Sequence, residues 1–176
     1  MHKMKKVLFV DIQNSILSPM AEAWFNRYSG GCRVASSCGT QPATWLDGRA
    51  AQAMHQVGID IGSKRPERIG YQQLAQADVV VLMGVGLEIF EWVDVRSWKI
   101  AEPPDPSFED VCILRDRVRE SVEALIGEIK RQNTEPHLTD TLWKLAIESS
   151  LSAQFMHQRS VAHGESDHDR LSTSHI

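Results

Sequence analysis

One segment near the amino terminus constrains the fold more than any other. Residues 7–10 (VLFV) form an uninterrupted apolar run, which is typical of a strand at the centre of a parallel sheet. A short loop later, Ser18-Pro19 predicts a helix start, with serine as N-cap and proline in the first helical position. A buried strand that turns directly into a helix points backbone N–H groups and the positive end of the helix dipole at one small space. The segment therefore predicts an oxyanion-binding loop in an α/β fold.

Further strands and helices alternate along the chain. Strands are predicted at 33–37, 78–83 and 95–100. The helix that starts at Ser18 has an inward stripe of Met20, Trp24 and Tyr28 and ends at Gly30-Gly31. Asp47 caps a second helix over 48–57, and Ser107 caps a long amphipathic helix whose apolar residues recur up to Ile129. This alternation predicts an α/β domain with a mainly parallel sheet and right-handed crossovers.

The composition changes after residues 132–136, which read as a linker. We predict one α/β domain over 1–132, a linker and helical extension over 133–157, and a disordered polar tail over 158–176 that contains His163, His168 and His175. The extension carries an apolar stripe of Trp143, Ile147, Leu151 and Phe155. That stripe either packs back on the domain or docks a partner or a second copy of the chain.

Composition excludes several classes of protein. The 176 residues are 42% hydrophobic and 24% charged, which are values of a globular protein. Nineteen Lys and Arg against 23 Asp and Glu give a net charge of −4, which argues against a nucleic-acid partner. No apolar run approaches the roughly 20 residues of a membrane span, and no signal peptide is evident, so we expect a cytoplasmic protein. Three cysteines without a CxxC pair predict no disulfide framework, and we predict no metal site and no cofactor.

Several segments, taken in order, resemble one family. These are VLFVDIQNSILSPMAEAWF (7–25), the stretch from SSCGTQPATW to SKRPERI (36–69), DVVVLM (78–83) and the segment from SWKIAEPPDPS to VEALI (97–126). They resemble the low-molecular-weight protein tyrosine phosphatases and the arsenate reductases that share their fold, over about residues 5–130. The resemblance implies the fold of that family, a three-layer α/β domain with a four-stranded parallel sheet and helices on both faces, here followed by the helical extension.

The resemblance also implies a role for the loop after the first strand. The family's signature there is a nucleophilic cysteine, five residues, an arginine and a serine. On this chain the cysteine position holds Asp11, a loop glycine is replaced by Gln13, a second cysteine by Ile16, and the arginine by Leu17. The framework positions match, and they are Asn14, Ser18, Pro19, Met20, Ala21 and Glu22.

These replacements change the chemistry that the loop offers. The family's reaction needs a thiolate of low pKa and a planar guanidinium that holds two oxygens of the transferring group. Asp11 adds a negative charge instead, and two unit charges about 4 Å apart repel by about 4 kcal/mol at an effective dielectric constant of about 20. We expect Asp11 to accept the loop N–H groups itself. The extra cysteines that the reductases use after the third strand are also missing from this chain.

The family's general acid is an aspartate before proline, ahead of the last helix, and two residues compete for that position. Counting back from Arg115-Asp116 selects Glu102, whereas the Asp-Pro motif selects Asp105. Either carboxyl group fits the sequence.

The function expected from the sequence is binding without catalysis. A degenerate family member would use the loop residues Gln13, Asn14, Ser15, Leu17 and Ser18 in a regulatory or scaffolding role. Its partner is an unknown protein or a second copy held through the extension. The alternative is an active phosphatase- or arsenate reductase-related enzyme that uses Asp11 with Glu102 or Asp105, assisted by a metal ion.

Overall fold

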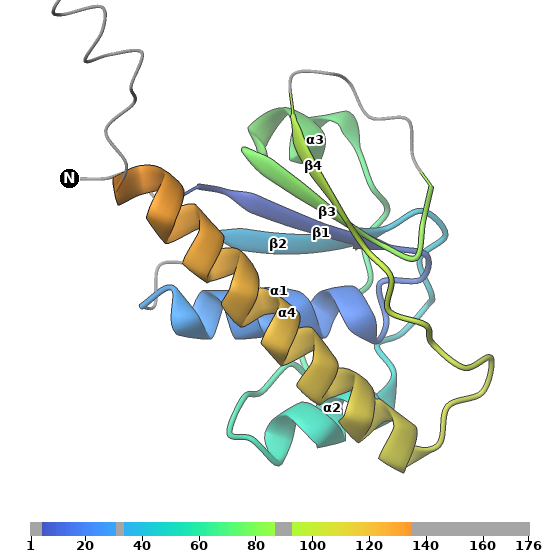
Figure 1. The fold of residues 1–176 in the computed structure, drawn as a ribbon. Coiled ribbons are helices and arrows are strands. Elements are labelled where there is room, and N and C mark those ends of the chain that lie inside the picture. The colour runs from blue at the N-terminus through green and yellow to red at the C-terminus, as the bar shows by residue number, and fades with distance from the viewer. Residues whose placement is uncertain (1–4, 31–33, 87–92, 135–176) are drawn as a thin grey trace, which may run out of the picture. The chain divides into compact units, whose positions relative to one another are not determined.

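The computed structural model describes residues 5–30, 34–86 and 93–134. At its centre lies a four-stranded sheet in the order β2-β1-β3-β4, in which all neighbouring strands are parallel (Figure 1). The strands are β1 (Val7–Asp11), β2 (Ala35–Gly39), β3 (Val79–Met83) and β4 (Asp94–Trp98). The predicted four-stranded parallel sheet is confirmed.

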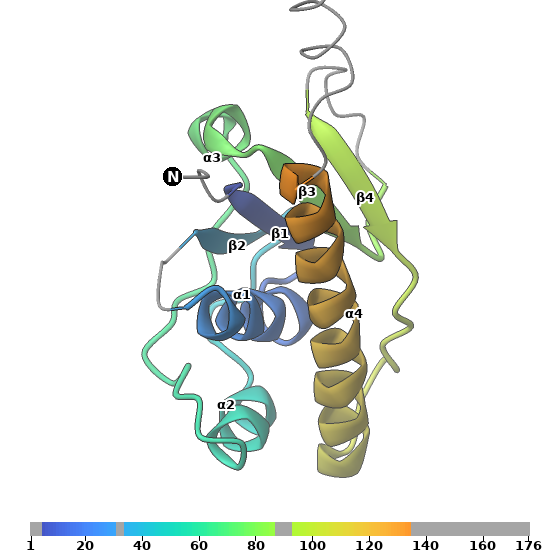
Figure 2. The same ribbon diagram turned by 60° about the vertical axis from the view of Figure 1, so that its left-hand side comes forward.

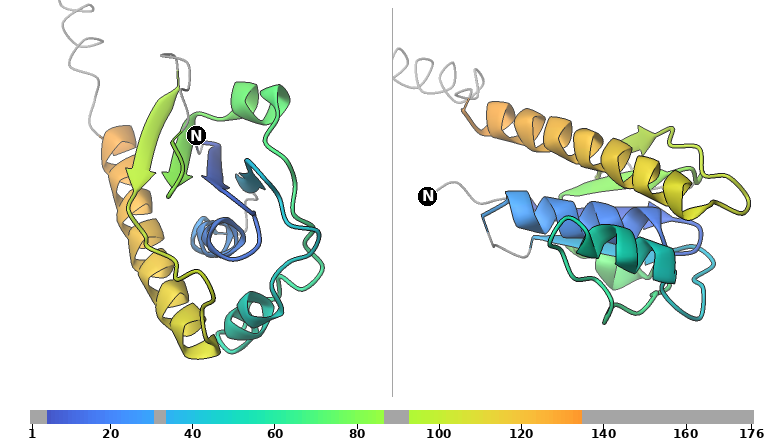
Figure 3. Two further views of the ribbon diagram at one scale, coloured as in Figure 1. Left: turned by 90° about the vertical axis from the view of Figure 1, so that its right-hand side faces the viewer. Right: turned by 90° about the horizontal axis from the view of Figure 1, so that it is seen from below.

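Helices cover both faces of this sheet, as predicted. The helices α1 (Leu17–Tyr28), α2 (Gly48–His55) and α4 (Phe108–Thr134) lie on one side, and α3 (Tyr71–Gln76) lies on the other (Figure 2). Seen from below in Figure 3, α2 lies in front of α1, and α4 passes beside them. The three-layer arrangement follows from strands that are apolar on both faces and must be covered on both.

The hydrophobic core divides at the sheet because successive side chains of a strand point to opposite faces. Phe9 belongs to the larger cluster, with α1, α2 and α4, where its ring contacts Phe25 and Trp98 at centroid distances of 6.0 and 5.6 Å. Leu8 and Val10 belong to the smaller cluster on the side of α3. All five residues of β1 are buried, which explains the uninterrupted apolar run in the sequence.

Two of the three predicted helix starts are confirmed by their caps. The carboxylate of Asp47 accepts a hydrogen bond from the backbone N–H of Arg49 at 2.8 Å, at the start of α2. Before α4, the Ser107 hydroxyl accepts from the Asp110 N–H at 3.1 Å, and the Asp110 carboxylate accepts from the Ser107 N–H at 2.9 Å. Such reciprocal bonds satisfy N–H groups that a helix start leaves unpaired.

The prediction for the start of α1 is wrong by two residues. The N-cap position is Ile16, and Ser18 lies inside the helix, fully buried. The acceptor for a first-turn N–H group is instead the carboxylate of Asp11, which binds the N–H of Ser18. The predicted inward position of Tyr28 also fails, since this side chain is 37% exposed while its ring stacks on Trp24.

Other boundaries also differ from the prediction. The second and fourth strands span 35–39 and 94–98, shifted from the predicted 33–37 and 95–100, and α2 ends at His55, two residues early. α3 was not predicted, because it is six residues long and has no buried residue to give a pattern. The helix α4 continues through Thr134, so the first residues of the predicted linker are helical. The rest of the linker, the extension and the histidine-containing tail lie outside the described residues.

The parallel sheet places four chain segments at one edge. The carboxyl ends of parallel strands meet at the same edge of a sheet, which is where α/β proteins usually bind ligands. Here the loop after β1 lies beside the residues that follow β2, β3 and β4. The site is built from these segments.

Candidate functional site

The loop between β1 and α1 closes on itself through Asp11. This residue ends β1 and is 5% exposed. Its carboxylate accepts hydrogen bonds from the backbone N–H groups of Asn14 at 2.5 Å and Ser18 at 2.9 Å. The sequence prediction that Asp11 accepts loop N–H groups is therefore confirmed. Burial raises the pKa of Asp11, and these hydrogen bonds only partly offset that effect.

The backbone of the loop takes a conformation that its residues permit. Asn14 has φ of +51°, in the left-handed region that asparagine adopts more readily than most residues. The loop also approaches β2 closely at Gly39. A Cβ atom there would lie 2.7 Å from the carbonyl oxygen of Ile12, so only glycine fits without a shift of the backbone.

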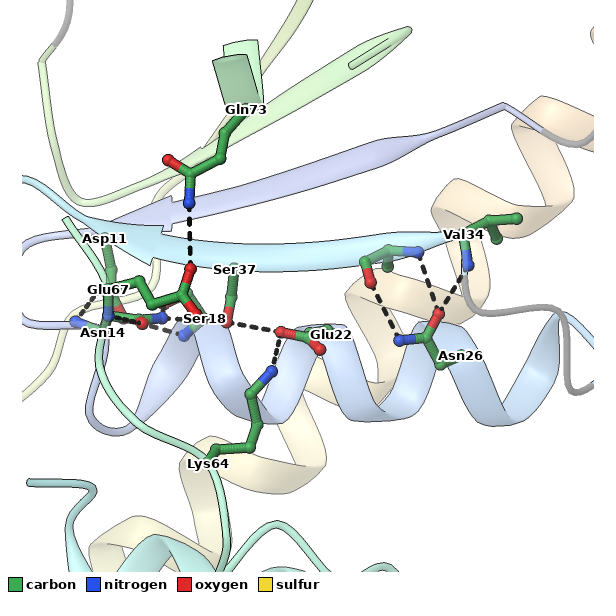
Figure 4. A network of polar contacts seen from close by, with 11 residues as sticks. Asp11, Asn14, Ser18, Glu22, Asn26, Val34, Ser37, Lys64, Glu67 and Gln73 are labelled. Atoms are coloured by element: carbon green, nitrogen blue, oxygen red, sulfur yellow. Dashed lines mark hydrogen bonds and ion pairs between the residues drawn. The ribbon is translucent and has the colours of Figure 1, made fainter. Parts of the chain in front are cut away.

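Asn14 holds the loop by its side chain as well (Figure 4). Its amide nitrogen donates to the hydroxyls of Ser18 at 2.8 Å and Ser37 at 3.0 Å, and its amide oxygen accepts from the Glu67 N–H at 2.9 Å. At 1% exposure, Asn14 therefore joins α1, β2 and the segment before α3. Buried polar groups are stable only when they are paired in this way.

The network extends from Ser37 to a charged pair. The Ser37 hydroxyl donates to the carboxylate of Glu22 at 2.7 Å, and Lys64 forms an ion pair with the same carboxylate (Figure 4). Sequence reasoning identified Glu22 only as a matching position and missed Ser37, Lys64 and Glu67. No local pattern distinguishes these three, because each acts through a partner that is far away in the sequence.

Backbone hydrogen bonds fix the loop to the segment that follows β2. The N–H groups of residues 40, 41, 43 and 47 donate to the carbonyl oxygens of residues 11, 12, 13 and 15, at 2.7–3.2 Å. Because these bonds do not depend on side chains, they preserve the shape of the loop whatever residue stands at position 13. Gln13 is exposed, and its side chain accepts a long hydrogen bond of 3.4 Å from the Ser15 hydroxyl.

A cavity of about 390 Å³ opens beside this loop, between the segments that follow β1, β3 and β4. Its buried part includes Asp11, Ser15, Ile16, Leu17 and Met83. The exposed part of the lining is Ile12, Gln13, Gly84 and residues 101–104. Among the described lining residues only Asp11 and Glu102 carry a charge. Leu17 is 3% exposed and brings an aliphatic side chain to the cavity.

The two candidate acids lie in different surroundings. Glu102 lines the cavity with Asp11, and although it is solvent-exposed overall, its pKa is raised by partial burial of the carboxyl group and by the charges of Asp11 and Asp47. The side chain of Asp105 is 97% exposed and lies 3.4 Å from Arg49, outside the lining. Arg49 also pairs with Asp47 at 2.7 Å. The structure thus brings Glu102, and not Asp105, to the cavity that Asp11 lines.

Neither described cysteine offers a thiolate to this cavity. Cys38 is fully buried in β2, and burial together with the charges of Asp11 and Glu67 raises its pKa to about 12. Cys112 lies on α4, away from the lining residues. Across residues 5–30, 34–86 and 93–134, no three His, Cys, Asp or Glu side chains gather as metal ligands. In the same part of the chain no helix has the length and apolar content that crossing a bilayer requires.

Known proteins are similar to this chain over most of its length. The family model for low molecular weight phosphotyrosine protein phosphatase matches residues 6–135. The glutaredoxin arsenate reductase of Synechocystis sp. is 34% identical over 131 residues, which is 72% of this chain and 99% of that protein. An arsenate reductase of Bacillus cereus is 30% identical over 135 residues, covering 73% of this chain and 100% of the relative.

Solved structures agree with this similarity. An arsenate reductase in the phosphate binding state superposes with a TM-score of 0.64 at 33% identity, over 72% of this chain and 99% of that one. A low molecular weight protein tyrosine phosphatase from T. tengcongensis, at 22% identity and a TM-score of 0.62 over 69% of this chain and 97% of that one, shares the fold. The chain belongs to the low molecular weight phosphotyrosine protein phosphatase family.

Proposed function

We propose that this chain is a catalytically inactive member of its family, which acts by binding a ligand or partner in a regulatory or scaffolding role. One observation carries the proposal. The carboxylate of Asp11 accepts the backbone N–H groups of Asn14 and Ser18, so these donors already hold a fixed acidic group. A phosphate or arsenate in the same loop would have to displace that group or lie beside it.

The electrostatics of the loop oppose phosphoryl chemistry. An incoming dianion would meet the Asp11 carboxylate, and each pair of unit charges about 4 Å apart costs about 4 kcal/mol at an effective dielectric constant of about 20. A carboxylate is also a weaker nucleophile toward an anionic ester than the thiolate that the family resemblance implies at this position.

The side chain at position 17 supports the same proposal. The resemblance implies an arginine there, whose guanidinium would hold two oxygens of the transferring group. Leu17 is buried instead, and no basic side chain is found among the described residues that line the cavity. Without a cation the negative charge that develops in the transition state loses its main stabilisation.

Neither of the two thiols in the described part of the chain, Cys38 and Cys112, lines the cavity where arsenate would be reduced. Several relatives are named arsenate reductases. A thiol attacks as its thiolate, and the raised pKa of Cys38 keeps that group protonated near neutral pH. Cys32 lies outside the described residues, so an assay has to test it directly.

A second candidate is an active enzyme of altered chemistry, in which Asp11 acts as nucleophile or base and Glu102 as general acid. Two observations favour it over other catalytic alternatives. Both carboxyl groups line one cavity, and the pKa of Glu102 is raised, which helps a carboxyl group to stay protonated and donate a proton. Such an enzyme needs a cation to neutralise the substrate, and a divalent metal ion is the simplest one.

Turnover by the purified full chain distinguishes these proposals. We expect hydrolysis of p-nitrophenyl phosphate, and reduction of arsenate with dithiothreitol as thiol donor, to equal those of the Asp11→Ala variant. Turnover that Asp11→Ala abolishes would refute the inactive assignment. If that turnover also requires Mg²⁺ or Mn²⁺ and falls in Glu102→Gln, the second candidate is correct.

Self-association through residues 133–157 is part of the same proposal. We propose that the stripe of Trp143, Ile147, Leu151 and Phe155 holds a second copy or a protein partner. Light scattering on the full chain would show a dimer that Leu151→Asp dissociates. A monomer at all accessible concentrations would leave only the interaction with another protein.

A further inference from the structure

The size and the largely aliphatic lining of the cavity beside the β1–α1 loop suit a small ligand with an apolar part. Its volume of about 390 Å³ lies in the range of small-molecule sites. Much of its lining is aliphatic, including Ile12, Ile16, Leu17, Met83 and Ile100, and it also includes two prolines. A lining of this kind accepts an apolar stem.

The charged groups of the same cavity are both acidic. Asp11 lies in its buried part and Glu102 in its exposed part. The nearby Arg49 offsets this charge only in part. It lowers the pKa of Glu102, but by less than Asp11 and Asp47 each raise it, and its guanidinium is already shared between the carboxylates of Asp47 and Asp105, at 2.7 and 3.4 Å. The charge of Asp47 in fact adds to that of Asp11 in raising the pKa of Glu102. The cavity therefore carries negative charge that no described side chain in its lining balances.

We propose that this cavity binds an organic cation, a primary ammonium or guanidinium group on an apolar stem, with its charged end between Asp11 and Glu102. The proposal rests on the proposed function, in which the site binds and does not catalyse. Two sources share this chemistry. One is a free alkylamine, and the other is a lysine or arginine side chain of a partner protein.

The recognition follows from the two parts of the cavity. The stem would replace water along Leu17, Met83 and Ile100, and the transfer of apolar surface out of water is favourable. The ammonium group would donate hydrogen bonds to the carboxylates, which accept them most strongly when ionised. Binding should therefore strengthen as the pH rises through the titration of Glu102.

Matched probes test this inference on the full chain. We would titrate n-pentylamine, the neutral isostere 1-pentanol and a blocked Gly-Lys-Gly peptide into ¹⁵N-labelled protein. The signals to follow are the amide resonances of residues 12–17 and 100–102. We expect n-pentylamine to bind about tenfold more tightly than 1-pentanol, a ratio that corresponds to about 1.4 kcal/mol. The preference for n-pentylamine over 1-pentanol should be smaller in Glu102→Gln. It should be unchanged in the control Glu120→Gln, which removes an exposed carboxylate from α4.

Each outcome decides the question. Tighter binding of the lysine peptide than of n-pentylamine supports a partner's side chain as the ligand, and the reverse supports a free amine. Equal binding of amine and alcohol, absence of amine binding, or an equal effect of the two glutamine variants would overturn the inference. If the amine titration fails and the native chain shows no turnover, only the cation inference is refuted and the proposed function stands. If the native chain shows turnover that Asp11→Ala abolishes, the proposed function itself is refuted.

Discussion

The carboxylate of Asp11 accepts a hydrogen bond of 2.9 Å from the backbone N–H of Ser18, the second residue of α1. This bond joins the last residue of β1 to the first turn of the helix that follows. An anion near a helix N-terminus is stabilised there by the unpaired N–H groups and the helix dipole. In this chain the protein itself supplies the acidic group that binds there, the carboxylate of Asp11.

Asn14 is predicted to contribute more to stability than its size suggests. Asn14→Ala removes three side-chain hydrogen bonds from a buried site and leaves their partners unsatisfied. We expect the free energy of unfolding to fall by about 2–4 kcal/mol. Denaturant titration measures this change, with Gln72→Ala on the exposed surface of α3 as the control, for which less than about 0.5 kcal/mol is expected. Equal effects of the two substitutions would contradict the assigned role of Asn14.

Gly39 is predicted to be intolerant of even one methyl group. In Gly39→Ala the new Cβ would meet the carbonyl oxygen of Ile12 at 2.7 Å and the backbone nitrogen of Asn14 at 3.0 Å. Since backbone atoms must move, we expect a loss of about 1–3 kcal/mol in the free energy of unfolding. Gly48→Ala is the matched control, because its Cβ would meet nothing within 4 Å and its place in α2 favours alanine. A Gly39→Ala protein as stable as Gly48→Ala would show that the loop is not held against β2.

The carboxyl groups of Asp11 and Glu102 are predicted to titrate interdependently. The charge of Asp11 helps to raise the pKa of Glu102, so Asp11→Asn should lower that pKa. The pKa of the Glu102 carboxyl is higher in the folded chain than in the unfolded chain. Its contribution to the free energy of unfolding is therefore fully present below the pKa of the unfolded state, and it is lost as the pH rises through the pKa of the folded state. The stability of Asp11→Asn should therefore fall less with rising pH than that of the native chain.

Carboxyl ¹³C NMR measures the pKa of Glu102 directly. Asp105→Asn is the control, because Asp105 is not among the groups that shift Glu102. An unchanged pKa of Glu102 in Asp11→Asn would show that the charge of Asp11 does not act on the Glu102 carboxyl group.

Cys38 is predicted to be unreactive in the folded chain. With a pKa of about 12, about one thiol in ten thousand is ionised at pH 8. Iodoacetamide at pH 8 should therefore label the partly exposed Cys112 well before Cys38, with both labelled after unfolding in guanidinium chloride. Peptide mass spectrometry distinguishes the sites. If Cys38 were labelled as fast as Cys112, its thiol would be reactive in the folded chain, and the claim that it cannot supply a thiolate would be wrong.

The sequence predicted the fold well where a local pattern determined the structure. The apolar run of β1, the Asp47 and Ser107 caps and the periodicity of α4 each reflect burial or a helix terminus, and each gave the correct element. α3 was not predicted because it is only six residues long and none of its residues is fully buried. The start of α1 was misplaced because the acceptor for the Ser18 N–H lies seven residues earlier, outside any local capping pattern.

The candidate site was only partly predictable. The position of Asp11 and its bonds to the loop followed from the strand–loop–helix pattern and from the resemblance. The choice between Glu102 and Asp105 could not be made from spacing, because it depends on how the segment after β4 folds over the sheet edge. The Ser37, Glu22 and Lys64 contacts depend in the same way on tertiary packing.

Binding of inorganic phosphate to the native chain tests the central claim most directly. Isothermal titration calorimetry at pH 7.5 would compare the native chain with Asp11→Ser, which removes the carboxylate that accepts the Asn14 and Ser18 N–H groups. We predict no binding to the native chain tighter than about 1 mM, and stronger binding to the variant. Phosphate bound by the native chain at micromolar concentration, and no more tightly by Asp11→Ser, would contradict the claim that Asp11 occupies this loop in place of an oxyanion.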